Sequence, residues 1–271
     1  MDLIKNFPRI GYGVYNVSRS QTSRCVMEAL ETGYRLIDTA ALYGNEKETA
    51  QGIRDFLLAH PEVKRNEIVY VSKLWDDSFG SSTERGFEDS YDNAGEPIDL
   101  YLMHSSGDGP RERKETWQIL ERKVADGKIR HLGVSNWGVK HLQELEKYAN
   151  IKPVVNQIEV NPWKQMDELV DYCAKKGIHI MVYSPLTMGK TLKNPQLLEL
   201  GSKYNKSPAQ IQLRYLVQRN LVPIPKTTNK ERMVENMDIF DFKLTDLEMK
   251  NLGDPGSYIM AIPGWDPTEW A

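Results

Sequence analysis

Hydrophobic and polar positions follow two alternating patterns along this chain. Short apolar runs predict eight β-strands, at Ile10–Tyr15, Leu36–Asp38, Ile68–Lys73, Ile98–His104, Ile129–Ser135, Val154–Glu159, His179–Ser184 and Leu221–Pro225. Amphipathic stretches between them predict helices, at Ser20–Thr32, Glu46–Ala59, Ser82–Ala94, Glu112–Asp126, Val139–Ala149, Met166–Lys176, residues 195–218, Lys230–Phe240 and Thr245–Leu252. Pro195 and the Ser207-Pro208 pair divide residues 195–218 into two helices, since proline suits the first position of a helix.

Strands that alternate with helices are typical of parallel βαβ units. Eight units favour an α/β fold with a single (β/α)8 TIM barrel over residues 1–271, carrying an extra C-terminal helix and a short tail. The length of 271 residues suits one barrel of about 250 residues, and no linker or low-complexity segment divides the chain. The rival interpretation is an open dinucleotide-binding sheet of the Rossmann type, whose G-x-G-x-x-G motif opens a helix. Gly11-Tyr12-Gly13 lacks the third glycine of that motif, and no helix opens there.

Composition narrows the classes of partner. The 35 Lys and Arg against 38 Asp and Glu give a net charge of −3 without a long basic run, which argues against nucleic acid. No stretch reaches the roughly 18 apolar residues of a membrane span, and the first residues show no leader pattern, so we expect a cytoplasmic protein. Cys25 and Cys173 belong to no metal-binding cluster and are expected to be reduced. No coiled-coil repeat demands a partner, which favours a monomer.

Polar residues recur where the predicted strands end, the end at which barrels carry their chemistry. Asp38, Lys73 and His104 end three consecutive strands, and Tyr43 follows the first of them. Each alone fits a commonplace role, such as a helix cap, a solvated charge or a packed histidine. Together they suit proton transfer, because a nearby ammonium favours phenolate and a histidine can hydrogen-bond a carbonyl oxygen.

The segment Gly33–Glu46 resembles the first signature of the aldo-keto reductases, a (β/α)8 family that reduces aldehydes and ketones with NADPH. Later motifs resemble that family in the same order, at Val71–Trp75, Asp99–His104, Gly133–Asn136, Asn156-Gln157, Tyr183–Leu186 and Ile224–Thr228. The resemblance covers essentially the whole chain and is closest to short-loop microbial and fungal reductases.

The resemblance implies a catalytic tetrad of Asp38, Tyr43, Lys73 and His104. Tyr43 would be the general acid for the reduced carbonyl oxygen, Lys73 and Asp38 would tune it, and His104 would orient the carbonyl. The substrate would be a small-molecule carbonyl compound, and the cofactor would supply the hydride.

The resemblance also implies a site for NADPH or NADP+. Its nicotinamide end would be held by Ser135, Asn136, Gln157 and Tyr183, and its ribose and pyrophosphate by Gly13, Val14, Ser184 and Leu186. The 2′-phosphate and adenine would be held by Lys226, Thr227, Arg232, Glu235 and Asn236, with Thr228 in the same motif. Cations beside a helix N-terminus make a good phosphate pocket, which favours NADP(H) over NAD(H).

The chain departs from larger members of this family at the rim of the barrel. Only about 30 residues separate His104 from Ser135, Ser105 replaces a tryptophan common in those members, and the C-terminal segment is short. The substrate pocket is therefore expected to use Tyr15, Trp75 and His104, with Trp265 or Trp270 of the tail. A shorter rim predicts an open mouth and a broad substrate range.

Two rival functions remain open at this point. One is a non-catalytic barrel that binds NADPH and acts as a regulatory or interaction subunit, as some relatives do. The other is a lyase in which Lys73 forms a Schiff base, which leaves Lys226, Thr227 and Arg232 unexplained.

Overall fold

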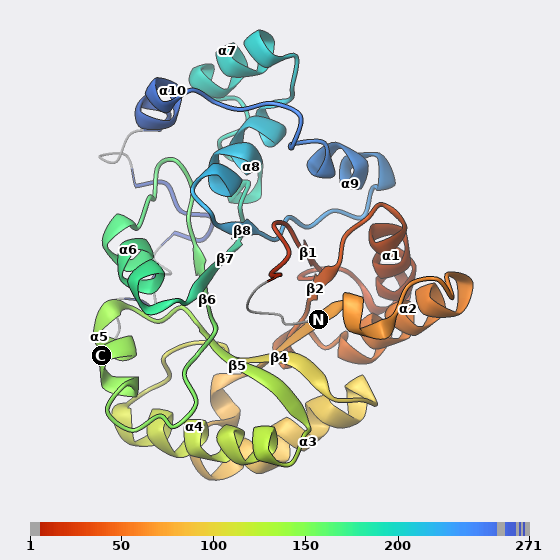
Figure 1. Ribbon diagram of the computed structural model, residues 1–271, viewed down its shortest axis with the longest axis vertical. Helices are drawn as coiled ribbons and strands as arrows, with labels where there is room; N and C mark the ends of the chain where they lie inside the picture. Colours follow the sequence, from red (N-terminus) through yellow and green to blue (C-terminus); the bar gives the residue numbers. More distant parts are fainter. Residues whose placement is uncertain (1–5, 254–257, 264–265, 267, 269–271) are drawn as a thin grey trace.

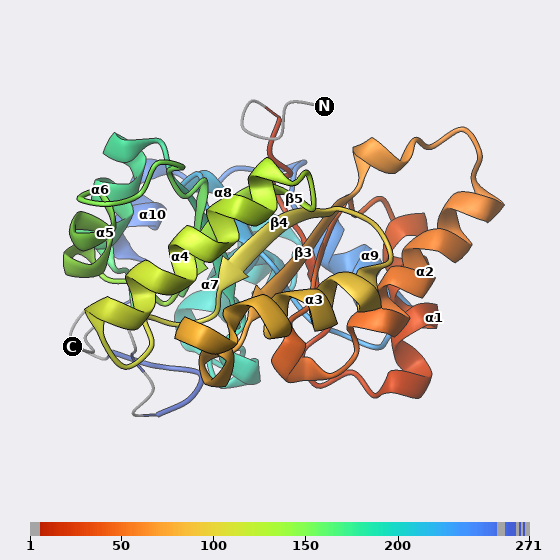
Figure 2. The ribbon, with the colours of Figure 1, turned by 90° about the horizontal axis from the view of Figure 1, so that it is seen from below.

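The computed structural model describes residues 6–253, 258–263, 266 and 268. In that part of the chain eight parallel strands lie side by side in chain order. They are β1 (Tyr12–Gly13), β2 (Leu36–Asp38), β3 (Val69–Leu74), β4 (Ile98–Met103), β5 (Ile129–Ser135), β6 (Val155–Glu159), β7 (His179–Tyr183) and β8 (Val222–Pro223). Figure 1 shows the helices arranged around these strands, and Figure 2 shows the same arrangement after a turn of 90°.

The helices fall where the amphipathic pattern predicts them. They are α1 (Arg19–Glu31), α2 (Glu46–Ala59), α3 (Thr83–Ala94), α4 (Pro110–Ala125), α5 (Val139–Leu145), α6 (Asp167–Lys176), α7 (Pro195–Tyr204), α8 (Pro208–Gln218), α9 (Lys230–Met237) and α10 (Asp246–Asn251). Residues 195–218 form two helices as expected, and Ser207 caps the second by accepting the N–H of Gln210. Gly86 lies inside α3, where a Cβ would come within 2.6 Å of Ser78 Cβ.

Backbone hydrogen bonds close the row of strands into a barrel. Gly11 donates to Pro223 O at 2.9 Å and Gly13 donates to Pro225 O at 3.1 Å, which joins the first strand segment to the last. The first and last strand segments approach closely, because a Cβ on Gly11 would lie 2.8 Å from Ile224 Cγ2. The predicted (β/α)8 barrel is therefore confirmed.

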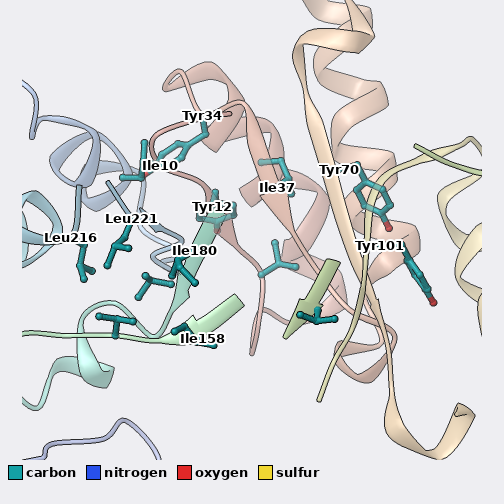
Figure 3. Packing of buried hydrophobic residues seen from close by; sticks show 14 of the residues in the cluster. Ile10, Tyr12, Tyr34, Ile37, Tyr70, Tyr101, Ile158, Ile180, Leu216 and Leu221 are labelled. Carbon is teal, nitrogen blue, oxygen red and sulfur yellow. The ribbon is translucent and has the colours of Figure 1, made fainter. Parts of the chain in front are cut away.

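Alternation along the strands divides the buried apolar side chains into two groups. One group fills the inside of the barrel: Leu36, Val69, Val71, Leu100, Leu102, Val155, Met181, Val222 and Ile224. The other, larger group packs between strands and helices and includes Ile37, Tyr70 and Tyr101, which Figure 3 shows. Because side chains alternate with a period of two, each strand serves both groups.

Some predicted elements are longer than those observed. β1 and β8 have two residues each instead of the five or six expected at Ile10–Tyr15 and Leu221–Pro225. Proline has no N–H to donate, so Pro223 and Pro225 limit the ladder at β8. α5 and α9 likewise end at Leu145 and Met237, before the predicted ends.

None of the helices in the described residues combines the length and the apolar character needed to cross a membrane. Cys25 and Cys173 are both free and buried, as expected for reduced packing residues.

Candidate active site

Several strands carry a polar side chain at the end of their inward-facing row, directly above the apolar interior of the barrel. Asp38, Lys73 and His104 each come two residues after an inward-facing residue, which is Leu36, Val71 or Leu102. Ser135 and Gln157 occupy the same register on β5 and β6, where they pair with each other. The polar ends of separate strands thereby meet at one end of the barrel.

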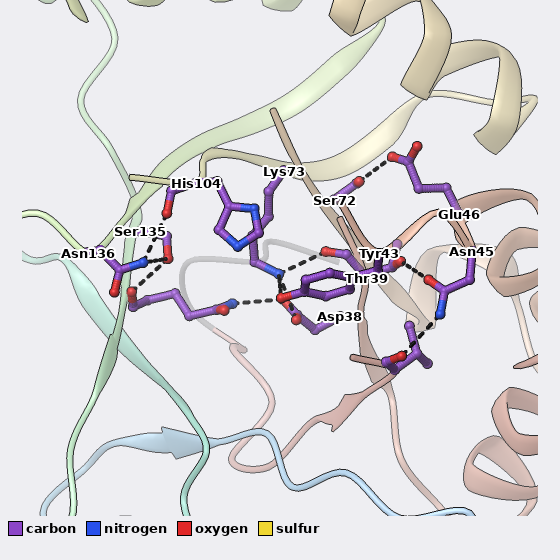
Figure 4. A network of polar contacts seen from close by, with 12 residues as sticks. Asp38, Thr39, Tyr43, Asn45, Glu46, Ser72, Lys73, His104, Ser135 and Asn136 are labelled. Carbon is purple, nitrogen blue, oxygen red and sulfur yellow. Dashed lines mark hydrogen bonds and ion pairs between the residues drawn. The ribbon is translucent and has the colours of Figure 1, made fainter. Parts of the chain in front are cut away.

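Lys73 is the centre of this group, with a fully buried side chain. Its ammonium donates to Asp38 Oδ1 at 2.8 Å, to Thr39 O at 2.8 Å and to Tyr43 Oη at 3.3 Å, as Figure 4 shows. Gln157 Nε2 donates to the other Asp38 oxygen at 2.7 Å. All three hydrogens of Lys73 have acceptors, and the residue does not line the adjoining cavity, so nothing here favours a Schiff-base nucleophile.

Tyr43 ends a short 3₁₀ turn, Ala41–Tyr43, which a left-handed Gly44 terminates at φ 65°. The turn is braced from behind by Asn45, which accepts from Thr39 Oγ1 at 2.8 Å and donates to Val14 O at 3.0 Å. This brace fixes the phenol against the strand ends, because Thr39 directly follows Asp38.

Burial governs the protonation of the group. It raises the pKa of Asp38 and lowers the pKa of Lys73. The charge of each residue partly opposes the effect of burial on the pKa of the other. Burial, assisted by the Asp38 charge, raises the pKa of Tyr43 well above 10. The direction of this shift is opposite to the effect expected of a nearby ammonium, because desolvation by burial is its largest cause. Burial also lowers the pKa of His104 well below 6.5, so its imidazole is neutral.

A cavity of 460 Å³ opens above these residues. Its lining includes most of the residues predicted for the site: Gly13, Tyr15, Asp38, Tyr43, Trp75, His104, Ser135, Asn136, Gln157, Tyr183, Ser184, Leu186 and Lys226. The other predicted residues do not line it: Lys73, Val14, Thr227, Thr228, Arg232, Glu235 and Asn236.

The wall at β5 and β6 is preorganised by hydrogen bonds. Ser135 Oγ donates to Gln157 O at 2.9 Å, and Asn136 Nδ2 donates to both His104 O and Ser135 Oγ. Asn136 adopts a left-handed backbone at φ 63°, as does Ser184 at φ 45° after β7. Both amide hydrogens of Asn136 are thus donated to protein oxygens, which leaves its side-chain carbonyl oxygen available to a ligand.

Most of the predicted cofactor residues that do not line the cavity lie in α9 or in the segment before it: Thr227, Thr228, Arg232, Glu235 and Asn236. Val14 instead directly follows β1. Asn229 caps this helix by accepting the N–H of Arg232 at 2.8 Å. Lys226 and Arg232 are exposed, and neither side chain has a hydrogen-bonding or ion-pair partner among the described residues. Two unpaired cations beside a helix N-terminus fit a phosphate group.

Comparisons with known proteins agree with this geometry. The family model described as "Aldo/keto reductase family" matches residues 9–254. The chain belongs to the aldo/keto reductase family. It is 42% identical over 248 residues to the glyoxal reductase of Bacillus subtilis, covering 90% of this chain and 87% of that protein.

Solved structures of other family members have the same barrel. An aldo-keto reductase of Bombyx mori, solved in complex with NADP, superposes with a TM-score of 0.83 at 36% identity, covering 91% of this chain and 88% of that one. An aldo-keto reductase from a Medee basin deep-sea metagenome library gives 0.86 at 36% identity, covering 96% and 93%. This aldo/keto reductase is accordingly an NADP-dependent oxidoreductase that acts on carbonyl groups.

The mouth of the reductase cavity is mostly apolar. The Tyr15 ring lies 5.0 Å from the Tyr43 ring, and the Trp75 ring lies 5.0 Å from the His104 ring, so both flank the site as expected. Sequence reasoning missed three exposed apolar residues that also line it: Leu42, Met188 and Ile262. Only Leu42 lies within a recognised motif, the segment Gly33–Glu46. Trp265 and Trp270 lie outside the described residues.

Two side chains of the barrel hold the tail segment that brings Ile262 to the cavity. The buried Glu159, at the end of β6, accepts the N–H of Ala261 at 2.6 Å. Lys190, after β7, donates to the carbonyl oxygen of Ala261 at 2.6 Å. Part of the wall at the mouth therefore comes from a segment far along the chain, which local sequence patterns do not reveal.

Proposed function

We propose that this chain reduces aldehydes and ketones with Tyr43 as the general acid and His104 as the residue that orients the carbonyl. The observation that carries the proposal is the buried chain of contacts from Asp38 through Lys73 to Tyr43 beside a cavity. The phenol and the neutral imidazole both line that cavity, so one carbonyl oxygen can contact both.

The raised pKa of Tyr43 fits the role of an acid. The hydroxyl keeps its proton until the carbonyl oxygen gains negative charge during reduction and becomes a stronger base. Lys73 then stabilises the phenolate through its ammonium, 3.3 Å from the phenol oxygen. Asp38 holds that ammonium in place and balances its charge.

The residues present fit an NADP cofactor. Asn136 lines the cavity, and its carbonyl oxygen accepts no hydrogen bond in the described part of the chain, so the cavity wall offers a polar group to a ligand. His104 Nδ1 is buried and also has no partner there. Lys226 and Arg232 would bind the 2′-phosphate, and Asn136 and Gln157 the nicotinamide amide. When bound, NADPH supplies the hydride for the carbonyl carbon.

Replacement of the phenol oxygen tests the proposal. Tyr43→Phe should lower kcat for a panel of carbonyl compounds by about 100-fold or more, because general acid catalysis contributes about that much. NADPH oxidation is followed at the nicotinamide absorbance, and NADPH binding by fluorescence titration should be unchanged. Tyr172→Phe is a matched control, since that hydroxyl donates to Glu146 and lies outside the cavity lining.

Unchanged turnover in Tyr43→Phe would refute the role of Tyr43. A wild-type protein that binds NADPH tightly but reduces no carbonyl compound would instead support the regulatory alternative.

We further propose that the enzyme is a cytoplasmic monomer with one domain over residues 1–271. The two buried, unpaired cysteines suit a reducing compartment. Light scattering should give the mass of one chain, 31.1 kDa, and a larger mass would refute the monomer. The apolar mouth also supports a broad substrate range, which strong discrimination among aromatic aldehydes, α-keto esters and aldoses would contradict.

A further inference from the structure

A buried carboxylate lies directly behind the turn that carries Tyr43. Glu46 is the first residue of α2 and is 4% exposed. Ser72 Oγ donates to one of its oxygens, and Asn93 Nδ2 donates to the other at 3.2 Å. Its contacts therefore tie together α2, β3 and α3, as the right side of Figure 4 shows for Ser72 and Glu46.

The partners of Glu46 set it apart from the other buried acidic residues in the described part of the chain. Asp38, Asp99 and Glu159 each lie within 4.0 Å of a lysine or arginine nitrogen. Glu46 has only neutral hydrogen-bond donors and forms no ion pair there. Burial of a carboxylate without a cation costs free energy, so stability alone gives no reason for this residue type.

The location of Glu46 suggests a reason. Its contact Ser72 immediately precedes Lys73 on β3, and the two side chains leave the strand on opposite faces. Only Gly44 and Asn45 separate Glu46 from Tyr43. The contact between Glu46 and Ser72 therefore joins the turn that bears the phenol to the strand that bears the ammonium.

We propose that Glu46 is a positioning residue, which holds the Tyr43 turn against β3 so that the phenol oxygen stays within reach of the Lys73 ammonium. The proposal rests on the proposed function of Tyr43. The negative charge of Glu46 also raises the pKa of Lys73, which opposes the effect of burial. Glu46 touches neither the cavity nor the reacting atoms and acts through Tyr43 and Lys73.

Three variants test the proposal. Glu46→Ala removes the carboxylate and its hydrogen bonds to Ser72 and Asn93. Glu46→Gln keeps the shape of the side chain without its charge, and Ser72→Ala removes the hydrogen-bond donor on β3. We expect kcat to fall about 10-fold in Glu46→Ala and less in the other two, because small displacements of reacting groups are costly. The KM for the carbonyl compound and the Kd for NADPH should stay within about twofold, since neither ligand contacts Glu46.

Glu144→Gln is the matched control. This glutamate pairs with the buried Arg113 between α4 and α5 and lies outside the cavity lining, so kcat should not change. Unfolding by urea shows whether each variant is folded. If Glu46→Ala does not fold, Glu46→Gln and Ser72→Ala decide the outcome.

A double-mutant cycle separates this proposal from the proposed function. If Glu46 acts through Tyr43, then Glu46→Gln should change the residual rate of Tyr43→Phe by less than about twofold. Folded Glu46 and Ser72 variants with wild-type kcat would overturn the positioning role even where Tyr43→Phe is inactive. Full activity of Tyr43→Phe would overturn the proposed function instead.

Discussion

At the scale of single residues, surroundings decide what each charged group can do. Lys73 and Arg232 are both cations, but Lys73 is buried with three acceptors, whereas Arg232 is exposed without a partner among the described residues. Lys73 has all its hydrogen bonds within the protein, so it can hold the phenol in place. Arg232 is available to a ligand, because no protein contact must break when it binds.

Arg232→Ala should therefore weaken NADPH binding while leaving NADH binding nearly unchanged. Loss of a charged hydrogen bond to the 2′-phosphate should cost about 1.5 to 3 kcal/mol, or roughly 10-fold to 100-fold in Kd. The Kd values for both nucleotides are measured by fluorescence titration. Lys230→Ala is the control, since that neighbour on α9 already pairs with Glu31. Equal losses for both nucleotides would mean that the phosphate pocket is elsewhere.

At the scale of elements, hydrogen bonds join helices that are distant along the chain. The Glu248 carboxylate of α10 accepts from Thr245 at the start of its own helix and from Lys203 and Tyr204 of α7. A single carboxylate thus caps one helix and holds a second. These hydrogen bonds lower the pKa of Glu248 to about 2 from an ordinary 4.5, despite its partial burial.

This shift predicts a pH dependence of stability. Because the pKa of Glu248 is lower in the folded protein, its contribution is present above pH 4.5 and is lost as the pH falls toward 2. Glu248→Gln should reduce the free energy of unfolding by about 1 kcal/mol at pH 6, which allows for screening near the surface, and by little near pH 2. Urea unfolding at several pH values measures this, with the exposed Glu199→Gln of α7 as control. A difference that is constant with pH would contradict the assignment.

At the scale of the whole molecule, closure of the barrel joins the first strand segment to the last. The hydrogen bonds from Gly11 and Gly13 to the β8 segment join residues more than 200 positions apart. The apolar groups inside and outside the strands also draw on every part of the barrel. Neither half of the chain can complete these contacts alone.

The barrel should consequently unfold in one cooperative transition. Fluorescence of the buried Trp117 and Trp137 and far-ultraviolet circular dichroism should give the same urea midpoint. Two separated transitions would contradict the single domain proposed for residues 1–271.

Much of the fold could be predicted because its signals are local. Periods of 2 and 3.6, together with Pro195 and Ser207-Pro208, were sufficient to place the strands and helices. The ends of short elements were less predictable. β1 and β8 are short because the prolines of one segment restrict pairing with its neighbours, which is a property of the sheet and not of either segment.

The sequence by itself determined the barrel, the family resemblance and the grouping of Asp38, Lys73 and His104, because strand periodicity fixes which side chains face inward. Only the tertiary structure decided the raised pKa of Tyr43, the burial of Glu46 and the place of Ile262 at the mouth. Desolvation and long-range contacts depend on segments that meet only after the barrel has closed.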